Sequence, residues 1–166
     1  MLVYLVRHAI AVPHDSPGVS GDAERELTPE GIRKMRRHVL ALKKQGVKLD
    51  RVWSSPLIRA RQTADLLVEG LKVAAGVELV RELAPGVDAD WLFKLLDRHT
   101  HLTGVALVGH EPDMGELASL LLCGNRTAAI PFKKGAVACL DVADFKPPTR
   151  GQLLWLLTPR QMAAIA

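Results

Sequence analysis

Residues 2–9 read LVYLVRHA, and this stretch decides how the rest of the chain can fold. The five apolar residues at its start, which include β-branched and aromatic types, predict a short strand that is buried on both faces. The strand runs directly into Arg7 and His8. Ligands of open α/β sheets bind beyond the carboxyl ends of the strands, so these two side chains lie where a binding site is expected.

Arg7 and His8 have suitable chemistry for such a site. An arginine presents a planar fork of donors that matches phosphate or carboxylate, and a histidine has the unperturbed pKa closest to neutrality. The Arg7-His8 pair indicates a binding site only if other parts of the chain bring further groups to the same ligand. The residues at the ends of the other strands therefore have to be considered.

Strand and helix patterns alternate along the rest of the chain. Apolar runs predict further strands at 51–54, 77–81 and 105–108, and each is followed by apolar residues at helical spacing. Two final runs, 136–142 and 152–157, have the pattern of an antiparallel hairpin around the loop 146–151. The predicted fold class is α/β with three α/β/α layers: a mainly parallel sheet, helices on both faces and an antiparallel edge.

Helix-start residues fix several of the expected boundaries. Thr28 is the expected N-cap of the helix after the first strand, with Pro29 at its first position. Ser55 is the expected cap of the next helix. Asp88 or Asp90 can cap the one after that. With 166 residues, the whole chain, 1–166, is expected to form one domain with a proper core.

Composition limits the classes of function. The formal net charge is +4, which suits anionic partners, but only 4% of residues are aromatic, which leaves little for stacking on bases. The basic residues between Arg33 and Lys44 predict the solvent face of an amphipathic helix, with His38 also facing solvent. We therefore expect no nucleic acid among the partners.

Location and redox state follow from similar observations. No apolar run approaches the length of a membrane span, and the first strand leaves no room for a leader, so we expect a cytoplasmic protein without a membrane partner.

Cys123 and Cys139 both lie in apolar surroundings and are expected to be buried free thiols. His99 and His101 have metal-like spacing but no accompanying carboxylate or cysteine, so a surface loop is expected there.

Three strand ends supply groups for one pocket. Arg7 and His8 follow the first strand, Arg59 lies in the first turn of the helix after the second, and His110 follows the strand 105–108. Two arginines and two histidines at one edge form a cationic pocket for a tetrahedral dianion. One histidine can attack phosphorus when its ring is neutral, and the other can donate to a phosphoryl oxygen.

Three motifs then point to a known family. Arg7-His8-Ala9, the segment SSPLIRARQTA at 54–64 and VGHE at 108–111 resemble the histidine phosphatase superfamily, and they occur in that family's order. Within it the chain is most similar to the small SixA-type phosphohistidine phosphatases. The short length, the segment DAERELTPEG at 22–31 and the absence of a large insert support this.

The resemblance implies a fold and a set of roles. The fold would be phosphoglycerate mutase-like, and catalysis would need no metal and no other cofactor. His8 would be the nucleophile that is transiently phosphorylated, with Arg7, Arg59 and His110 completing the phosphate pocket. Ala9 departs from the family pattern, where many members have glycine, and this could alter the backbone after His8.

The general acid and the substrate contacts are less constrained. The polar loop 10–25 is expected to form the rim of the site and supplies Arg25 as a substrate-binding residue. Relatives place a carboxylic acid near the third strand or just after the second histidine, so Glu82 and Glu111 are the candidates, with Glu82 favoured. Glu111 is the candidate for substrate binding, and it could instead simply face the dipole of the following helix.

The expected function is a metal-independent phosphatase that works through a phosphohistidine intermediate on His8. Its expected partner is a phosphorylated protein that carries phosphohistidine. Two alternatives remain open: hydrolysis or mutase chemistry on a small phosphorylated molecule in the same pocket, and a non-catalytic module that binds phosphorylated ligands through Arg7 and Arg59. The second histidine argues against the binding module, because binding alone needs only the arginines.

Overall fold

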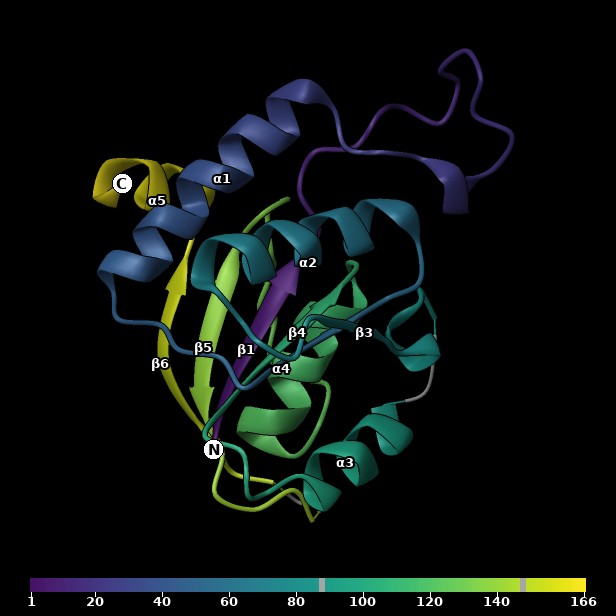
Figure 1. Ribbon diagram of the computed structural model, residues 1–166. Coiled ribbons are helices and arrows are strands. Elements are labelled where there is room, and N and C mark those ends of the chain that lie inside the picture. Colours follow the sequence, from purple (N-terminus) through teal and green to yellow (C-terminus); the bar gives the residue numbers. More distant parts are fainter. Residues whose placement is uncertain (87–88, 147–148) are drawn as a thin grey trace.

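The computed structural model describes residues 1–86, 89–146 and 149–166 (Figure 1). Its middle layer is a six-stranded sheet in the order β3-β2-β4-β1-β5-β6. The strands are β1 (Leu2–Arg7), β2 (Arg51–Ser54), β3 (Val77–Leu79), β4 (Gly104–Gly109), β5 (Val137–Asp141) and β6 (Gln152–Leu157). The first four pair in parallel, whereas β5 pairs antiparallel with both β1 and β6.

Helices cover both faces of this sheet. They are α1 (Pro29–Lys44), α2 (Ile58–Leu71), α3 (Ala89–Arg98), α4 (Asp113–Cys123) and α5 (Pro159–Ile165), with short 3-10 turns η1 (Asp22–Glu24) and η2 (Arg81–Leu83). One core lies between the sheet and α1, α2 and α5, and a second lies between the sheet and α3 and α4 (Figure 1). This is the predicted three-layer α/β fold with an antiparallel edge.

Strand β1 has the burial that its sequence predicts. Val3 and Leu5 pack into the core of α3 and α4, while Tyr4 and Val6 pack into the core of α1, α2 and α5. All four side chains are 5% exposed or less. A central strand with two buried faces has no solvated side, which explains its continuous apolar run.

Two predicted boundaries are wrong. The third strand ends at Leu79, because Arg81–Leu83 turns into the 3-10 helix η2. Helix α2 begins at Ile58 without a side-chain cap, so Ser55 does not cap it. Thr28 does cap α1, since its side chain accepts a hydrogen bond from the Gly31 N–H. Asp88 lies outside the described residues, and Asp90 lies inside the first turn of α3.

Helix α5 was not predicted, and its presence corrects the placement of His38. A capping box at Thr158 starts the helix, and Met162 is fully buried against the sheet. Helix α5 packs beside α1, and the backbone of Gly135 lies against the His38 ring, so that side chain is only 3% exposed. The expectation that His38 faces solvent is therefore wrong.

The two cysteines differ in exposure. Both are free thiols, but only Cys139 is buried, so the prediction that Cys123 is buried is wrong. In the described part of the chain, no helix is both long enough and apolar enough to cross a membrane.

Candidate active site

The carboxyl ends of β1 and β4 bring His8 and His110 together. The two strands pair in parallel, with Arg7 opposite Gly109. His8 and His110 are the next residues on the two strands, so they leave the sheet side by side. The two imidazole rings lie 5.1 Å apart, centroid to centroid, and both side chains are buried. The convergence of strand ends that the sequence predicts is therefore present.

The hydrogen bonds of His8 identify which ring nitrogen is unprotonated. Nδ1 lies 2.7 Å from the carbonyl oxygen of Ala9, and a carbonyl only accepts, so Nδ1 carries the proton. Nε2 lies 3.3 Å from Nε of Arg59, whose N–H donates to it. The unprotonated Nε2 therefore faces the guanidinium group of Arg59. This arrangement suits a nucleophile that is held beside a phosphate-binding group.

Burial keeps both histidines neutral. It lowers the pKa of His8 to about 4, with smaller contributions from the positive charges of Arg59, Arg7 and Lys134. Burial likewise lowers the pKa of His110 to about 3, followed by the effect of the neighbouring His8. At neutral pH His8 therefore has the unprotonated Nε2 that attack on phosphorus requires.

These shifted pKa values predict a pH dependence of stability. The unfolded histidines protonate near pH 6.5, whereas folded His8 and His110 do so only near pH 4 and 3. The unfolded state therefore binds more protons as the pH falls from 6.5, and the free energy of unfolding should drop by up to about 1.4 kcal/mol per pH unit for each histidine. Urea unfolding at pH 7 and pH 5 measures this. Equal midpoints would contradict it.

His110 is held by the serine that was expected to cap a helix. Nε2 of His110 lies 2.8 Å from Oγ of Ser55, whose hydroxyl accepts a hydrogen bond from the Leu57 N–H and has its own proton to donate to Nε2, which leaves the ring proton on Nδ1. Ser55 is fully buried. Nδ1 of His110 is buried without a partner among the described residues. The ring is thus oriented through one nitrogen and offers the other to a ligand.

Arg7 is fixed by the segment before β5. Its Nη1 donates to the carbonyl of Phe132 at 2.6 Å, while its Nε is buried without a partner in the described ranges. The Gly135 N–H donates to the carbonyls of both Arg7 and His8. Residues 132–135 therefore hold the end of β1 in place and leave one guanidinium donor for a ligand.

Arg59 is anchored by Asp22, an interaction that the sequence analysis did not predict. Nη2 of Arg59 lies 2.7 Å from Oδ2 of Asp22, and Nη1 donates to the Asp22 carbonyl at 2.5 Å. Burial alone would raise the pKa of Asp22, but hydrogen bonds from Arg59 and Arg25 lower it to about 2. The pair therefore stays ionised and fixes the direction of the guanidinium.

Arg25 lies in the same cluster, beside Asp22. Its Nε donates to the Val12 carbonyl at 2.7 Å, and its Nη1 pairs with Asp22 at 2.9 Å. These contacts tie the loop 10–25 together around Asp22. The structure thus places Arg25 in the support of Arg59, and no substrate contact is needed to explain it.

Ala9 and Thr63 connect the nucleophile to α2. The Ala9 N–H donates to Oγ1 of Thr63, which in turn donates to the Arg59 carbonyl. Ala9 does not have a positive φ, because Lys72 is the one non-glycine residue with that conformation in the described segments. Alanine in place of the family's glycine therefore causes no strain after His8.

The two candidate acids differ in how firmly they are held. Glu111 is tied down, since its Oε1 accepts from the Phe132 N–H at 2.8 Å, while its Oε2 is buried and has no partner among the described residues. Glu82 lies half-buried in η2, which packs beside β4, and no described residue pairs with its carboxylate. Glu111 thus supports the segment before β5 that positions Arg7, whereas the Glu82 carboxylate is not held by any described residue.

The fold and this pocket are those of a phosphate-transferring enzyme, and the comparison with known families agrees. The chain belongs to the histidine phosphatase superfamily (branch 1), whose model matches residues 3–87. Within that superfamily it is of the SixA type, and it is a phosphatase.

Relatives and solved structures support this placement. The phosphohistidine phosphatase SixA of Escherichia coli (strain K12) is 28% identical over 161 residues, which cover 96% of this chain and 94% of that protein. A structure of the protein histidine phosphatase SixA complexed with tungstate has a TM-score of 0.85 at 27% identity, covering 98% of this chain and 99% of that one. The alpha-ribazole phosphatase of Shigella flexneri shares the fold with a TM-score of 0.76 at 17% identity, covering 96% and 97%.

Proposed function

We propose that this protein is a metal-independent phosphatase that hydrolyses phosphohistidine in proteins through a covalent intermediate on His8. The observation that carries the proposal is the set of ring and guanidinium nitrogens around His8. Nε of Arg7 and Nδ1 of His110 are buried without partners among the described residues, and the lone pair of His8 Nε2 faces Arg59. A buried polar atom without a partner is costly, and a phosphoryl group would satisfy these donors together.

The proposed reaction has two displacements at phosphorus. Nε2 of His8 forms a bond to phosphorus, while the bond from phosphorus to the substrate imidazole breaks and its electron pair leaves with that ring, which takes up a proton. Water then attacks the phosphoryl group on His8, and the Nε2–phosphorus electron pair returns to His8 as inorganic phosphate leaves. Arg7, Arg59 and His110 stabilise the charge on the phosphoryl oxygens in both steps.

The choice of phosphohistidine rests on leaving-group chemistry and on the relatives. An imidazole that is protonated leaves readily, so the reaction needs no strong general acid. No carboxylate of the described residues contacts His8 or His110, although Asp22 lies next to Arg59. The Escherichia coli relative is named for the same substrate.

A comparison of substrates tests the proposal. Phosphate release is measured, without added metal and with a chelator present, from a protein phosphorylated on histidine and from a simple phosphomonoester. The expected result is fast release from the phosphohistidine protein and much slower release from the ester. Preference for the ester would contradict the proposed substrate and favour the small-molecule alternative.

The free carboxylate of Glu82 leads to a prediction about the general acid. An alkoxide leaving group needs a proton, so Glu82→Gln should slow phosphomonoester hydrolysis by about 10²-fold and change phosphohistidine hydrolysis by less than about threefold. Glu111→Gln keeps the oxygen that accepts from Phe132, so it should change neither rate strongly. Steady-state rates of both variants on both substrates check this. An ester-specific loss in Glu111→Gln instead would assign the acid to Glu111.

A further inference from the structure

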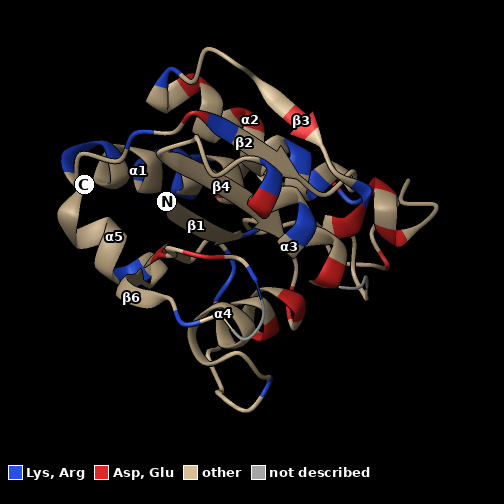
Figure 2. Cartoon of the chain, turned by 90° about the horizontal axis from the view of Figure 1, so that it is seen from below, with Lys and Arg blue, Asp and Glu red and all other residues tan. Residues whose placement is uncertain are grey.

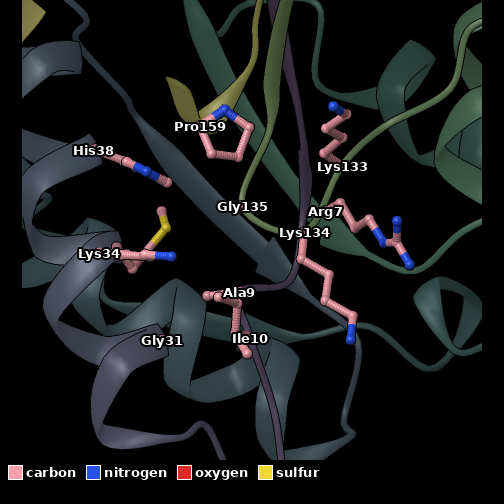
Figure 3. Close-up of a pocket in the computed structure, with 11 residues that line it drawn as sticks. Arg7, Ala9, Ile10, Gly31, Lys34, His38, Lys133, Lys134, Gly135 and Pro159 are labelled. Carbon is pink, nitrogen blue, oxygen red and sulfur yellow. The ribbon is translucent and has the colours of Figure 1, made fainter. Parts of the chain in front are cut away.

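A second hollow lies beside the phosphate pocket, on the side of α1. Its volume is about 340 Å³, and it is bounded by α1, the end of β1 and the turn 133–136 (Figure 3). Arg7 and Ala9, the neighbours of His8 in the chain, belong to its wall. We call this space the lysine hollow, after Lys34, Lys133 and Lys134 in its lining.

The lining of the lysine hollow is positively charged. It contains no aspartate or glutamate. Lys34 pairs with Glu30 at 2.7 Å, but both side chains are about half exposed and such pairs contribute little. Lys133 and Lys134 have no carboxylate partner in the part of the chain that the structure describes. Figure 2 shows the blue of Lys and Arg along α1, on the side of the molecule where the C-terminus lies.

His38 adds a buried polar atom to the same wall. Its side chain is 3% exposed, and its ring lies against the backbone of Gly135, which acts on the imidazole through a hydrogen bond. In Figure 3 the His38 ring reaches from α1 toward the hollow, as does the side chain of Lys34. Lys133 and Lys134 have no carboxylate partner among the described residues, and no acidic side chain lines the hollow, so this wall is suited to a polar, anionic group.

The lysine hollow is mechanically tied to the nucleophile. The Ala136 N–H donates to the Lys133 carbonyl and closes the turn, and Gly135 at its corner has a φ of +79°. The Gly135 N–H also donates to the carbonyls of Arg7 and His8. A group held by the lysines of this turn therefore has a fixed position relative to His8.

We propose that the lysine hollow is a substrate subsite that binds a carboxylate group of the phosphorylated substrate, supplied by an acidic side chain close to the phosphohistidine. This inference rests on the proposed function. The phosphate pocket contacts only the phosphoryl group, which all substrates share, so selection among substrates must come from neighbouring surfaces. The hollow has room for one or two side chains, and its lysines match carboxylates in charge.

Two synthetic peptides test the subsite. Both carry one phosphohistidine, and they differ only in flanking residues, which are Asp and Glu in one and Asn and Gln in the other. The wild-type enzyme should have a kcat/KM roughly tenfold higher for the acidic peptide, because one or two charge-assisted hydrogen bonds are gained. The double variant Lys34→Gln/Lys133→Gln should lose this preference and keep the wild-type rate on phosphoramidate, which has no carboxylate.

A matched control separates the hollow from net charge. Lys43→Gln/Lys48→Gln removes the same charge from exposed positions that do not line the hollow, and it should keep the preference. Equal kcat/KM values for the two peptides, or a preference that survives in Lys34→Gln/Lys133→Gln, would overturn the subsite.

The subsite can still be tested if the proposed phosphohistidine substrate is wrong. If only phosphomonoesters are hydrolysed, phosphohistidine is not the substrate, and the same comparison is made with an ester that bears a carboxylate and with its amide. A carboxylate preference that depends on Lys34 and Lys133 then supports the subsite on a small molecule. Equal rates for the two esters overturn it.

Discussion

Replacing His8 with alanine is expected to lower kcat for phosphate release by about 10⁴-fold or more, because the variant lacks the atom that attacks phosphorus. The other site histidine is a poor substitute, because Ser55 holds Nε2 of His110 and its Nδ1 then carries the ring proton. The Arg7 and Arg59 donors remain, so the KM should change far less than kcat. Single-turnover and steady-state phosphate release on a phosphohistidine substrate measure both constants.

The control for this prediction is a histidine outside the pocket. His99 packs its ring against Trp53 and donates through Nδ1 to the Leu95 carbonyl, away from the strand ends. His99→Gln should keep kcat within about twofold, as is usual for a partly exposed position away from the chemistry. A His8→Ala enzyme with the wild-type kcat would show that His8 is not the nucleophile.

Arg59→Lys is expected to lower kcat/KM by about 10²- to 10³-fold, which is the usual cost of losing one fixed donor to a developing negative charge. Arg59 contacts His8 through Nε and Asp22 through both terminal nitrogens. A lysine keeps the charge but has a single ammonium group, so it cannot make both sets of contacts. Phosphate release by the purified variant, with folding checked by circular dichroism, measures the effect.

Two further variants make this result specific. Arg61→Lys changes an exposed residue on the same helix and should leave kcat/KM unchanged. Asp22→Asn keeps the shape of the side chain but removes the charge that fixes Arg59. The decrease in kcat/KM of this variant should therefore lie between those of Arg61→Lys and Arg59→Lys. If Arg59→Lys retained full activity, Arg59 would not be a fixed donor to the phosphoryl group.

The sequence predicts the fold well because the signals that decide it are local. The apolar run of β1, the alternation of strand and helix patterns and the N-cap at Thr28 depend on neighbouring residues only. The same locality explains why His8 and His110 could be placed together, since parallel strands end at one edge of a sheet. Helix α5 was missed because its seven residues are too few for a clear periodic pattern.

The parts of the site that could not be predicted depend on contacts between distant segments. Asp22 meets Arg59 across 37 positions of sequence, from a long polar loop without a regular pattern. Ser55 has the residue type and position of a helix cap, but it uses its hydroxyl to hold His110. His38 is buried where Gly135 lies against its ring and α5 packs beside α1. In each case the local sequence is compatible with an ordinary loop, cap or surface position. The residue that each side chain contacts comes from a distant segment and is known only from the tertiary fold.

The direct test of the account is to isolate the phosphorylated enzyme. The protein is mixed with a radiolabelled phosphohistidine substrate, quenched within milliseconds in base, digested and analysed by mass spectrometry. The account predicts one labelled site, on His8, stable to base and labile to acid, and absent from His8→Ala. A full rate of turnover with no label on the protein, or label on another residue, would contradict it.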